Sequence, residues 1–167
     1  MHNEVSVEKF LLILFLFFMS CLNTQATTWV KVDSNEYIDK DSVEYYVNDY
    51  GQADFNKKVF WYKQDNDKSK VFKDFEKDFK KSASYALVQY IIDINQKKIA
   101  SKSFYFYDKE GNSVLSQTCK DFELDWDTIV PNSKADLWYE LVKRPRYLKK
   151  IYKLQLIEQA QQENRNN

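Results

Sequence analysis

The residues with the clearest chemical potential are four carboxylates that alternate with three apolar side chains. The carboxylates are Asp121, Glu123, Asp125 and Asp127, and the apolar residues between them are Phe122, Leu124 and Trp126. In a β-strand this alternation places the four carboxylates on one face, because successive side chains point to opposite sides. Clustered carboxylate oxygens suit a hard cation such as Ca²⁺. A solvated strand face above a buried one is the simpler interpretation, so we expect no metal there.

A second acidic segment, Asp65-Asn66-Asp67-Lys68-Ser69, begins like a calcium-binding loop. It lacks the glycine that such a loop needs at its sixth position for the sharp turn. The segment is therefore interpreted as a polar loop.

Few of the residues that catalysis and zinc binding require are present. The only histidine is His2, inside the predicted export signal, and the two cysteines are Cys21 and Cys119. A mature chain without histidine cannot form a Ser-His-Asp or Cys-His catalytic group or the usual zinc sites. With two glycines in the chain, a glycine-rich phosphate loop is excluded too. We expect a protein that is not an enzyme and that needs no cofactor.

A dense block of basic residues lies near the C-terminus. Its members, our candidate partner-binding residues, are Lys143, Arg144, Arg146, Lys149, Lys150 and Lys153. Such a block could contact anionic lipid, a polyanionic glycan or an acidic patch on a protein. Alternatively it is a solvated helix face, balanced by the acidic segment at 121–127. We expect a protein partner, and we expect contact with a membrane only through a lipid anchor.

The N-terminal residues have the three-part plan of a secretory signal peptide. Met1–Lys9 is polar, Phe10–Met19 is an unbroken apolar run, and Ser20–Ala26 is small and polar. The apolar run is too short for an ordinary transmembrane helix. Residues 1–26 are therefore predicted to be a signal peptide, and the chain is predicted to be exported.

Two processing sites compete. Small residues in Thr24-Gln25-Ala26 favour cleavage after Ala26, which would release the protein into the periplasm or the medium. The alternative is a lipoprotein junction at Ser20-Cys21, with lipid on Cys21 and the domain held at the outer membrane. We expect the Ala26 site.

Composition narrows the classes of partner. The formal net charge is +0, which argues against nucleic acid, because neutralising phosphates needs a basic excess. Aromatic residues make up 17% of the chain, which favours strands and also suits a binding surface.

Hydrophobic alternation predicts an antiparallel meander of about six strands. The strands are expected at 29–32, 42–47, 58–63, 86–94, 99–107 and 113–117. Polar turns at 48–51, 95–97 and 108–112 separate some of these strands. The Ala86–Ile94 and Ile99–Tyr107 segments form the clearest hairpin, with its register set by the buried face.

Helices are predicted in the middle of the chain and, two in succession, near its C-terminus. Phe72, Phe75 and Phe79 recur at helical spacing, although the same segment could be an irregular insertion. Ser133 is expected to cap a helix over 134–143, with Asp136 closing a capping box, and Pro145 to follow its end. A second helix is predicted from Tyr147 to about Glu163, and the last residues are expected to be disordered.

The predicted fold class is therefore α+β, a single antiparallel sheet with a C-terminal helix packed on it. The domain limits are 1–26 for the signal peptide, 27–143 for the sheet domain and 144–167 for the basic helical tail.

Three motifs, in this order, resemble the surface-adhesin protein E family of bacterial exported proteins. They are Trp29-Val30-Lys31-Val32 followed by Tyr37-Ile38-Asp39 and Ser42-Val43, then Phe106-Tyr107-Asp108-Lys109-Glu110-Gly111, then Trp126-Asp127-Thr128-Ile129-Val130-Pro131-Asn132-Ser133. The resemblance covers about Trp29 to Lys143, and the basic tail lies outside it.

The resemblance implies a surface or periplasmic protein, sometimes lipid-anchored, with one antiparallel sheet and a closing helix. The type member of the family binds laminin, vitronectin and plasminogen. Members often link helix to sheet by a disulfide, and the corresponding positions here are Ile94 and about Lys143. Without it, the helix is expected to be held by Leu137, Trp138 and Leu141.

Two functions remain open at this point. The first is an exported binding protein of the adhesin E type that engages a host matrix protein or plasminogen through sheet aromatics and the basic tail. The second is a non-adhesive periplasmic protein, structural or accessory to an envelope complex. The sequence does not determine the oligomeric state.

Overall fold

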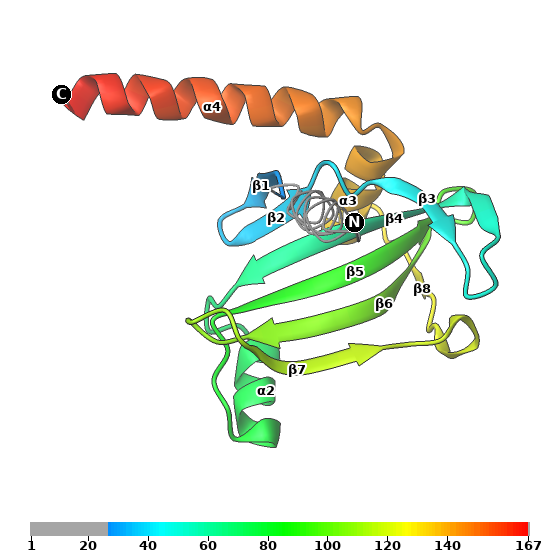
Figure 1. The fold of residues 1–167 in the computed structure, drawn as a ribbon. Helices are drawn as coiled ribbons and strands as arrows, with labels where there is room; N and C mark the ends of the chain where they lie inside the picture. The colour runs from blue at the N-terminus through cyan, green and yellow to red at the C-terminus, as the bar shows by residue number, and fades with distance from the viewer. Residues whose placement is uncertain (1–26, 167) are drawn as a thin grey trace, which may run out of the picture.

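The structure is a computed structural model that describes residues 27–166, which form one eight-stranded antiparallel sheet with helices against it (Figure 1). The strands are β1 (Trp29–Asp33), β2 (Glu36–Asp39), β3 (Glu44–Val47), β4 (Ala53–Asp65), β5 (Tyr85–Asp93), β6 (Lys98–Tyr107), β7 (Ser113–Thr118) and β8 (Asp127–Thr128). The helices are α2 (Lys70–Phe79), the 3-10 turn η1 (Asp121–Glu123), α3 (Lys134–Lys143) and α4 (Arg146–Asn166). The predicted signal peptide lies outside the described residues.

The strand order confirms the predicted α+β class. The main path is β1-β2-β4-β5-β6-β7, while β3 pairs with one end of β4 and β8 pairs with β6. The central β4, β5 and β6 supply the longest pairings, with Phe60 opposite Tyr90 and Val88 opposite Phe104. In the β5–β6 turn the Asp93 carboxylate accepts hydrogen bonds from the backbone N–H groups of Asn95 and Gln96, 2.9 and 2.8 Å away. Hydrogen bonds within the turn therefore fix the register of the central hairpin.

Two hydrophobic clusters lie on the same face of the sheet. The larger joins Phe60, Tyr62 and Ile92 of the sheet to α3 and the first turns of α4, and Val88 and Tyr90 pack against it. The smaller joins Phe72 and Phe75 of α2 to Ala86 and Phe106, and Phe104 packs against it. Because Ala86, Val88 and Tyr90 alternate along β5, both clusters occupy one side of the sheet.

Helix α3 closes the larger cluster. The Ser133 hydroxyl accepts the Asp136 backbone N–H at 3.2 Å, as predicted, whereas the Asp136 carboxylate accepts the N–H of Asn132 at 2.9 Å, not that of the capping residue. The helix ends at Lys143, just before the Arg144-Pro145 pair. The ring centroid of Trp138 lies 4.6 Å from that of Tyr62 and 5.2 Å from that of Tyr90.

The predicted packing face of α3 is wrong in one respect. Leu137 is 47% exposed, whereas Tyr139 and Val142 are buried together with Trp138 and Leu141. The helix is rotated so that its aromatic pair, and not Leu137, meets the sheet.

Helix α4 crosses the outer edge of β1 (Figure 1). The side-chain amide of Gln155 donates to the carbonyl oxygen of Lys31 at 2.8 Å and accepts the Lys31 N–H at 3.3 Å. Among the strands of residues 27–166, β1 pairs only with β2, so its outer edge carries backbone groups without a strand partner there. Gln155 therefore makes the hydrogen bonds to the Lys31 backbone that a neighbouring strand would otherwise make.

Several predicted boundaries are corrected. Tyr37-Ile38-Asp39 belongs to a strand, β2, and β3 begins at Glu44, two residues later than expected. The 70–79 segment is a helix, because it allows Phe72 and Phe75 to pack against the ring of Phe106 on the sheet.

The acidic 121–127 segment is not a strand. Its first three residues form η1, and only Asp127 and Thr128 pair, with β6. The four carboxylates therefore do not share a strand face.

None of the helices formed by residues 27–166 combines the length and the hydrophobicity that a membrane span needs.

Candidate binding surface

The face of the sheet opposite the helices carries a row of aromatic side chains. Phe60 and Tyr62 point into the helix-covered core, so Trp61 between them and Lys63 after them point to the other side. Cross-strand pairing extends this side, with Lys63 opposite Leu87, Leu87 opposite Tyr105, and Tyr85 opposite Tyr107. No helix of the described part of the chain packs on it.

We call this surface the aromatic face, and its members are half-buried. They are Tyr37, Trp61, Lys63, Tyr85, Tyr105 and Tyr107.

The rings of the aromatic face contact one another. The Trp61 and Tyr105 centroids lie 5.8 Å apart, and those of Tyr105 and Tyr107 lie 6.4 Å apart. Tyr85 and Tyr107 stack at 4.9 Å with an interplanar angle of 12°. These contacts fix the rings before any partner arrives, which lowers the entropy that binding must remove.

Lys63 lies between two of the tyrosines. Its Nζ is 5.2 Å from the ring centroids of both Tyr37 and Tyr85, and 2.8 Å from an oxygen of Asp65. Partial burial, and then the Asp65 carboxylate, raise the pKa of Tyr37. The Lys63 ammonium group therefore makes cation–π contacts with one ring on each strand that flanks β4, Tyr37 on β2 and Tyr85 on β5.

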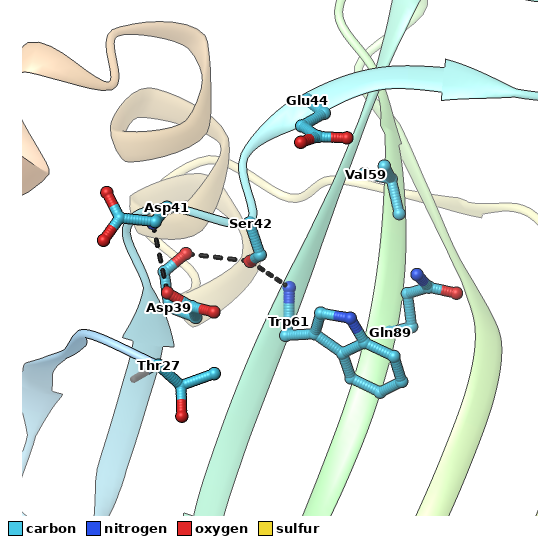
Figure 2. Close-up of a pocket in the computed structure, with 8 residues that line it drawn as sticks. All are labelled: Thr27, Asp39, Asp41, Ser42, Glu44, Val59, Trp61 and Gln89. Atoms are coloured by element: carbon cyan, nitrogen blue, oxygen red, sulfur yellow. Dashed lines mark hydrogen bonds between the residues drawn. The ribbon is translucent and has the colours of Figure 1, made fainter. Parts of the chain in front are cut away.

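An open hollow of about 790 Å³ lies at the end of the aromatic face, where the β2–β3 loop passes β4 (Figure 2). Its lining combines three carboxylates with polar and aromatic side chains. The lining residues are Thr27, Asp39, Asp41, Ser42, Glu44, Val59, Trp61 and Gln89. We call it the acidic hollow; Trp61 belongs to both surfaces.

Local hydrogen bonds shape the acidic hollow. The Ser42 hydroxyl donates to the Asp39 carbonyl oxygen at 2.8 Å and accepts the Trp61 backbone N–H at 2.8 Å. The Asp39 carboxylate accepts the Asp41 N–H at 3.1 Å. Figure 2 shows these bonds, with the Trp61 and Gln89 side chains beside them. The serine thus links the loop to β4 and sets the position of Trp61.

The pKa values of two carboxylates in the acidic hollow are shifted in opposite directions. Burial raises the pKa of Asp39, whereas hydrogen bonds from Lys40 lower the pKa of Asp41. Carboxylates beside an indole ring can bind a cationic side chain through charge-assisted hydrogen bonds and cation–π contact. The hollow therefore suits a lysine or arginine of a partner.

The six predicted partner-binding residues lie elsewhere, on the end of α3, the short linker and α4. Lys143, Arg144, Arg146, Lys149, Lys150 and Lys153 are all exposed. Lys143 Nζ lies 3.2 Å from the Tyr139 hydroxyl, and Arg144 lies 3.8 Å from Glu140. The structure keeps these residues together but separates them from the aromatic face. The predicted lipidation and cleavage residues, Cys21 and Ala26, lie outside the described residues.

The acidic segments hold no assembled metal site. Within residues 27–166, no group of three or more His, Cys, Asp or Glu side chains is placed to bind a metal ion. In the Asp65–Ser69 segment, Asp67 accepts the Ser69 N–H at 2.9 Å just before α2 begins. That loop leads into a helix.

Sequence reasoning missed a cluster around Lys102. Lys102 is the extra residue of a bulge, since Gln89 pairs with Ser103 while Tyr90 pairs with Ser101. Its Nζ lies 2.8 Å from Asp49 and 2.6 Å from Asp121, and Tyr46 donates to Asp121. Each aspartate also accepts the backbone N–H of the other, at 2.8 and 2.9 Å. We call this group the Lys102 clasp; it joins the β3–β4 turn to η1.

No protein-family model and no curated protein sequence matches this chain. Solved structures of Haemophilus influenzae protein E are similar to it. One, crystal form II, is 15% identical, covers 72% of this chain and 89% of that chain, and has a TM-score of 0.47. Another, from non-typeable Haemophilus influenzae, is 13% identical, covers 80% of this chain and 92% of that chain, and has a TM-score of 0.49. The similarity is at the level of the fold.

Proposed function

We propose that this chain is an exported, non-catalytic binding protein that engages a protein partner through the aromatic face and the acidic hollow. The observation that carries the proposal is the uncovered face of the central strands, with Trp61, Tyr85, Tyr105 and Tyr107 in mutual contact. An open aromatic surface of this kind suits a binding role.

The energetics favour these residues as binding anchors. Trp and Tyr are enriched among the side chains that dominate protein interfaces, because each buries a large area with few rotatable bonds. The rings are already half-buried and in contact, so little ordering remains to be done on binding. The acidic hollow next to Trp61 adds directional recognition of a basic side chain.

Export is supported by the sequence of residues 1–26, with its apolar run and small residues before Thr27. Lipid attachment at Cys21 remains the alternative form, in which the same domain is held at a membrane. The family resemblance supplies the first partners to test, which are laminin, vitronectin and plasminogen.

The test is surface plasmon resonance of the chain against these three proteins. We expect saturable binding to at least one, and a loss of about tenfold or more in affinity for Trp61→Ala/Tyr105→Ala, because each lost anchor costs about 1 kcal/mol or more. Tyr45→Ala/Phe55→Ala is the matched control, since that exposed ring pair lies 5.2 Å apart on β3 and β4.

Circular dichroism would confirm that both variants fold. Equal losses in both variants would reject the aromatic face as the binding site. Absence of binding to all three proteins would reject the adhesin role.

A further inference from the structure

Helix α4 has two different faces. Leu148, Ile151 and Tyr152 pack into the larger core cluster, and Gln155 contacts β1. At 100° per residue, the residues on the opposite side form a stripe that is basic and apolar. These residues are Arg146, Tyr147, Lys149, Lys150, Lys153, Leu154 and Ile157, and all are exposed. We call this stripe the outer face of α4.

The basic side chains of the outer face form no ion pairs within the described residues. Residues 143–157 contain six lysines and arginines and no carboxylate. Among the described residues, Arg146, Lys149, Lys150 and Lys153 have no ion pair within 4.0 Å. None of the four carboxylates at 121–127 forms an ion pair with these residues, and Asp121 pairs with Lys102 instead.

Apolar side chains lie between these charges. Tyr147, Leu154 and Ile157 are 38%, 51% and 53% exposed, although they belong to a helix that has a buried face available. Positions 147, 150, 154 and 157 form one ridge along the helix, and 146, 149 and 153 form the next. A basic ridge beside a largely apolar one is the pattern of helices that lie on membranes.

We propose that the outer face of α4 docks on the surface of an anionic lipid bilayer. The lysines and arginines contact the phosphate headgroups, while Tyr147, Leu154 and Ile157 enter the boundary between headgroups and acyl chains. A soluble glycan would match the charge but would leave these apolar side chains without a function. This contact is independent of the aromatic face and goes beyond the proposed function, so either can fail alone.

The experiment is co-sedimentation of the full chain with vesicles of pure phosphatidylcholine and of phosphatidylcholine with phosphatidylglycerol. The readout is the ratio of binding to anionic over neutral vesicles, which residues 1–26 cannot raise because they hold two glutamates and one lysine. We expect strong preference for anionic vesicles. Lys150→Glu/Lys153→Glu should lower the anionic binding constant by about 25-fold or more, at about fivefold per basic residue lost.

Lys73→Glu/Lys77→Glu on α2 is the matched control, because it changes net charge equally at exposed positions of another helix. It should retain most of the anionic preference. Equal losses for the two charge variants would overturn the proposal, since they would show a dependence on net charge alone.

Leu154→Ser/Ile157→Ser separates a bilayer from a soluble polyanion. It should weaken vesicle binding while leaving retention on a heparin column unchanged. A wild-type chain that binds heparin but neither kind of vesicle, or both kinds equally, would also overturn the proposal.

Discussion

The Tyr139 hydroxyl donates a hydrogen bond to the carbonyl oxygen of Ile94 at 3.1 Å, and so joins α3 to the end of the central hairpin. Lys143 Nζ lies 3.2 Å from the same hydroxyl. In this chain Ile94 and Lys143 are linked through one tyrosine.

Replacing Tyr139 by phenylalanine should lower the free energy of unfolding by about 1 kcal/mol, because the ring remains packed while the hydrogen bond to Ile94 is lost. Urea unfolding followed by fluorescence would measure it. Tyr50→Phe is the control, since Tyr50 is 85% exposed and its loss should change little. An unchanged midpoint for Tyr139→Phe would contradict a stabilising role for the hydrogen bond to Ile94.

The Lys102 clasp should contribute to stability as a unit. Lys102→Met removes the cation between Asp49 and Asp121 and should cost about 2 kcal/mol, since the two carboxylates would then repel each other. In the Lys102→Met background, Asp121→Asn should cost much less than it does alone. Additive losses in this double-mutant cycle would contradict the clasp.

Acid should weaken the same cluster. Partial burial disfavours the Asp121 carboxylate, but hydrogen bonds from Lys102 and Tyr46 outweigh it and lower the pKa of Asp121 to about 2. Because the folded pKa lies below the unfolded value of about 3.9, the stabilisation is complete above about pH 5 and is lost as pH falls towards 2. Urea midpoints of the wild type and Asp121→Asn should therefore converge in acid. A constant difference from pH 7 to pH 2.5 would contradict the assigned ion pair.

Removing the Gln155 side chain should loosen α4 from the sheet edge. In Gln155→Ala the N–H of Lys31 loses its acceptor, so its amide should exchange with deuterium faster than in the wild type. Gln161→Ala, at an exposed position of the same helix, is the control. Equal exchange in all three proteins would show that α4 does not protect β1.

The sequence predicted the central hairpin and α3 well because their signals are local. Alternation along 86–94, a polar turn, and a serine before a helical segment each depend on neighbours in the chain. The wrong orientation of Leu137 shows the limit, since the rotation of a helix depends on what it meets in space. The same holds for the 121–127 segment, whose alternation is overridden when Asp121 pairs with Lys102.

The aromatic face was only half predictable. Alternation in 99–107 separates Tyr105 and Tyr107 from Phe104 and Phe106, but it does not tell which pair the helices cover. The acidic hollow and the Lys102 clasp join segments far apart in the chain, so no spacing could reveal them. The signal that could have found the clasp is a lone lysine inside an otherwise apolar and small strand segment.

The site of N-terminal cleavage can be determined from the mass of the mature protein. Intact-mass analysis of the exported protein should give a chain that begins at Thr27, since Ala26 ends a run of small residues. A chain that begins at Cys21 with added acyl mass would establish the anchored form. A retained Met1 in protein held inside the cell would contradict export.

The most direct measurement of the central claim is hydrogen–deuterium exchange of the chain alone and with the partner that binds best among laminin, vitronectin and plasminogen. We expect slower exchange in β4, β5 and β6, around Trp61 and Tyr105, and in the 39–44 loop of the acidic hollow. Protection confined to α4, or to the helix-covered side at α2 and α3, would contradict binding through the aromatic face.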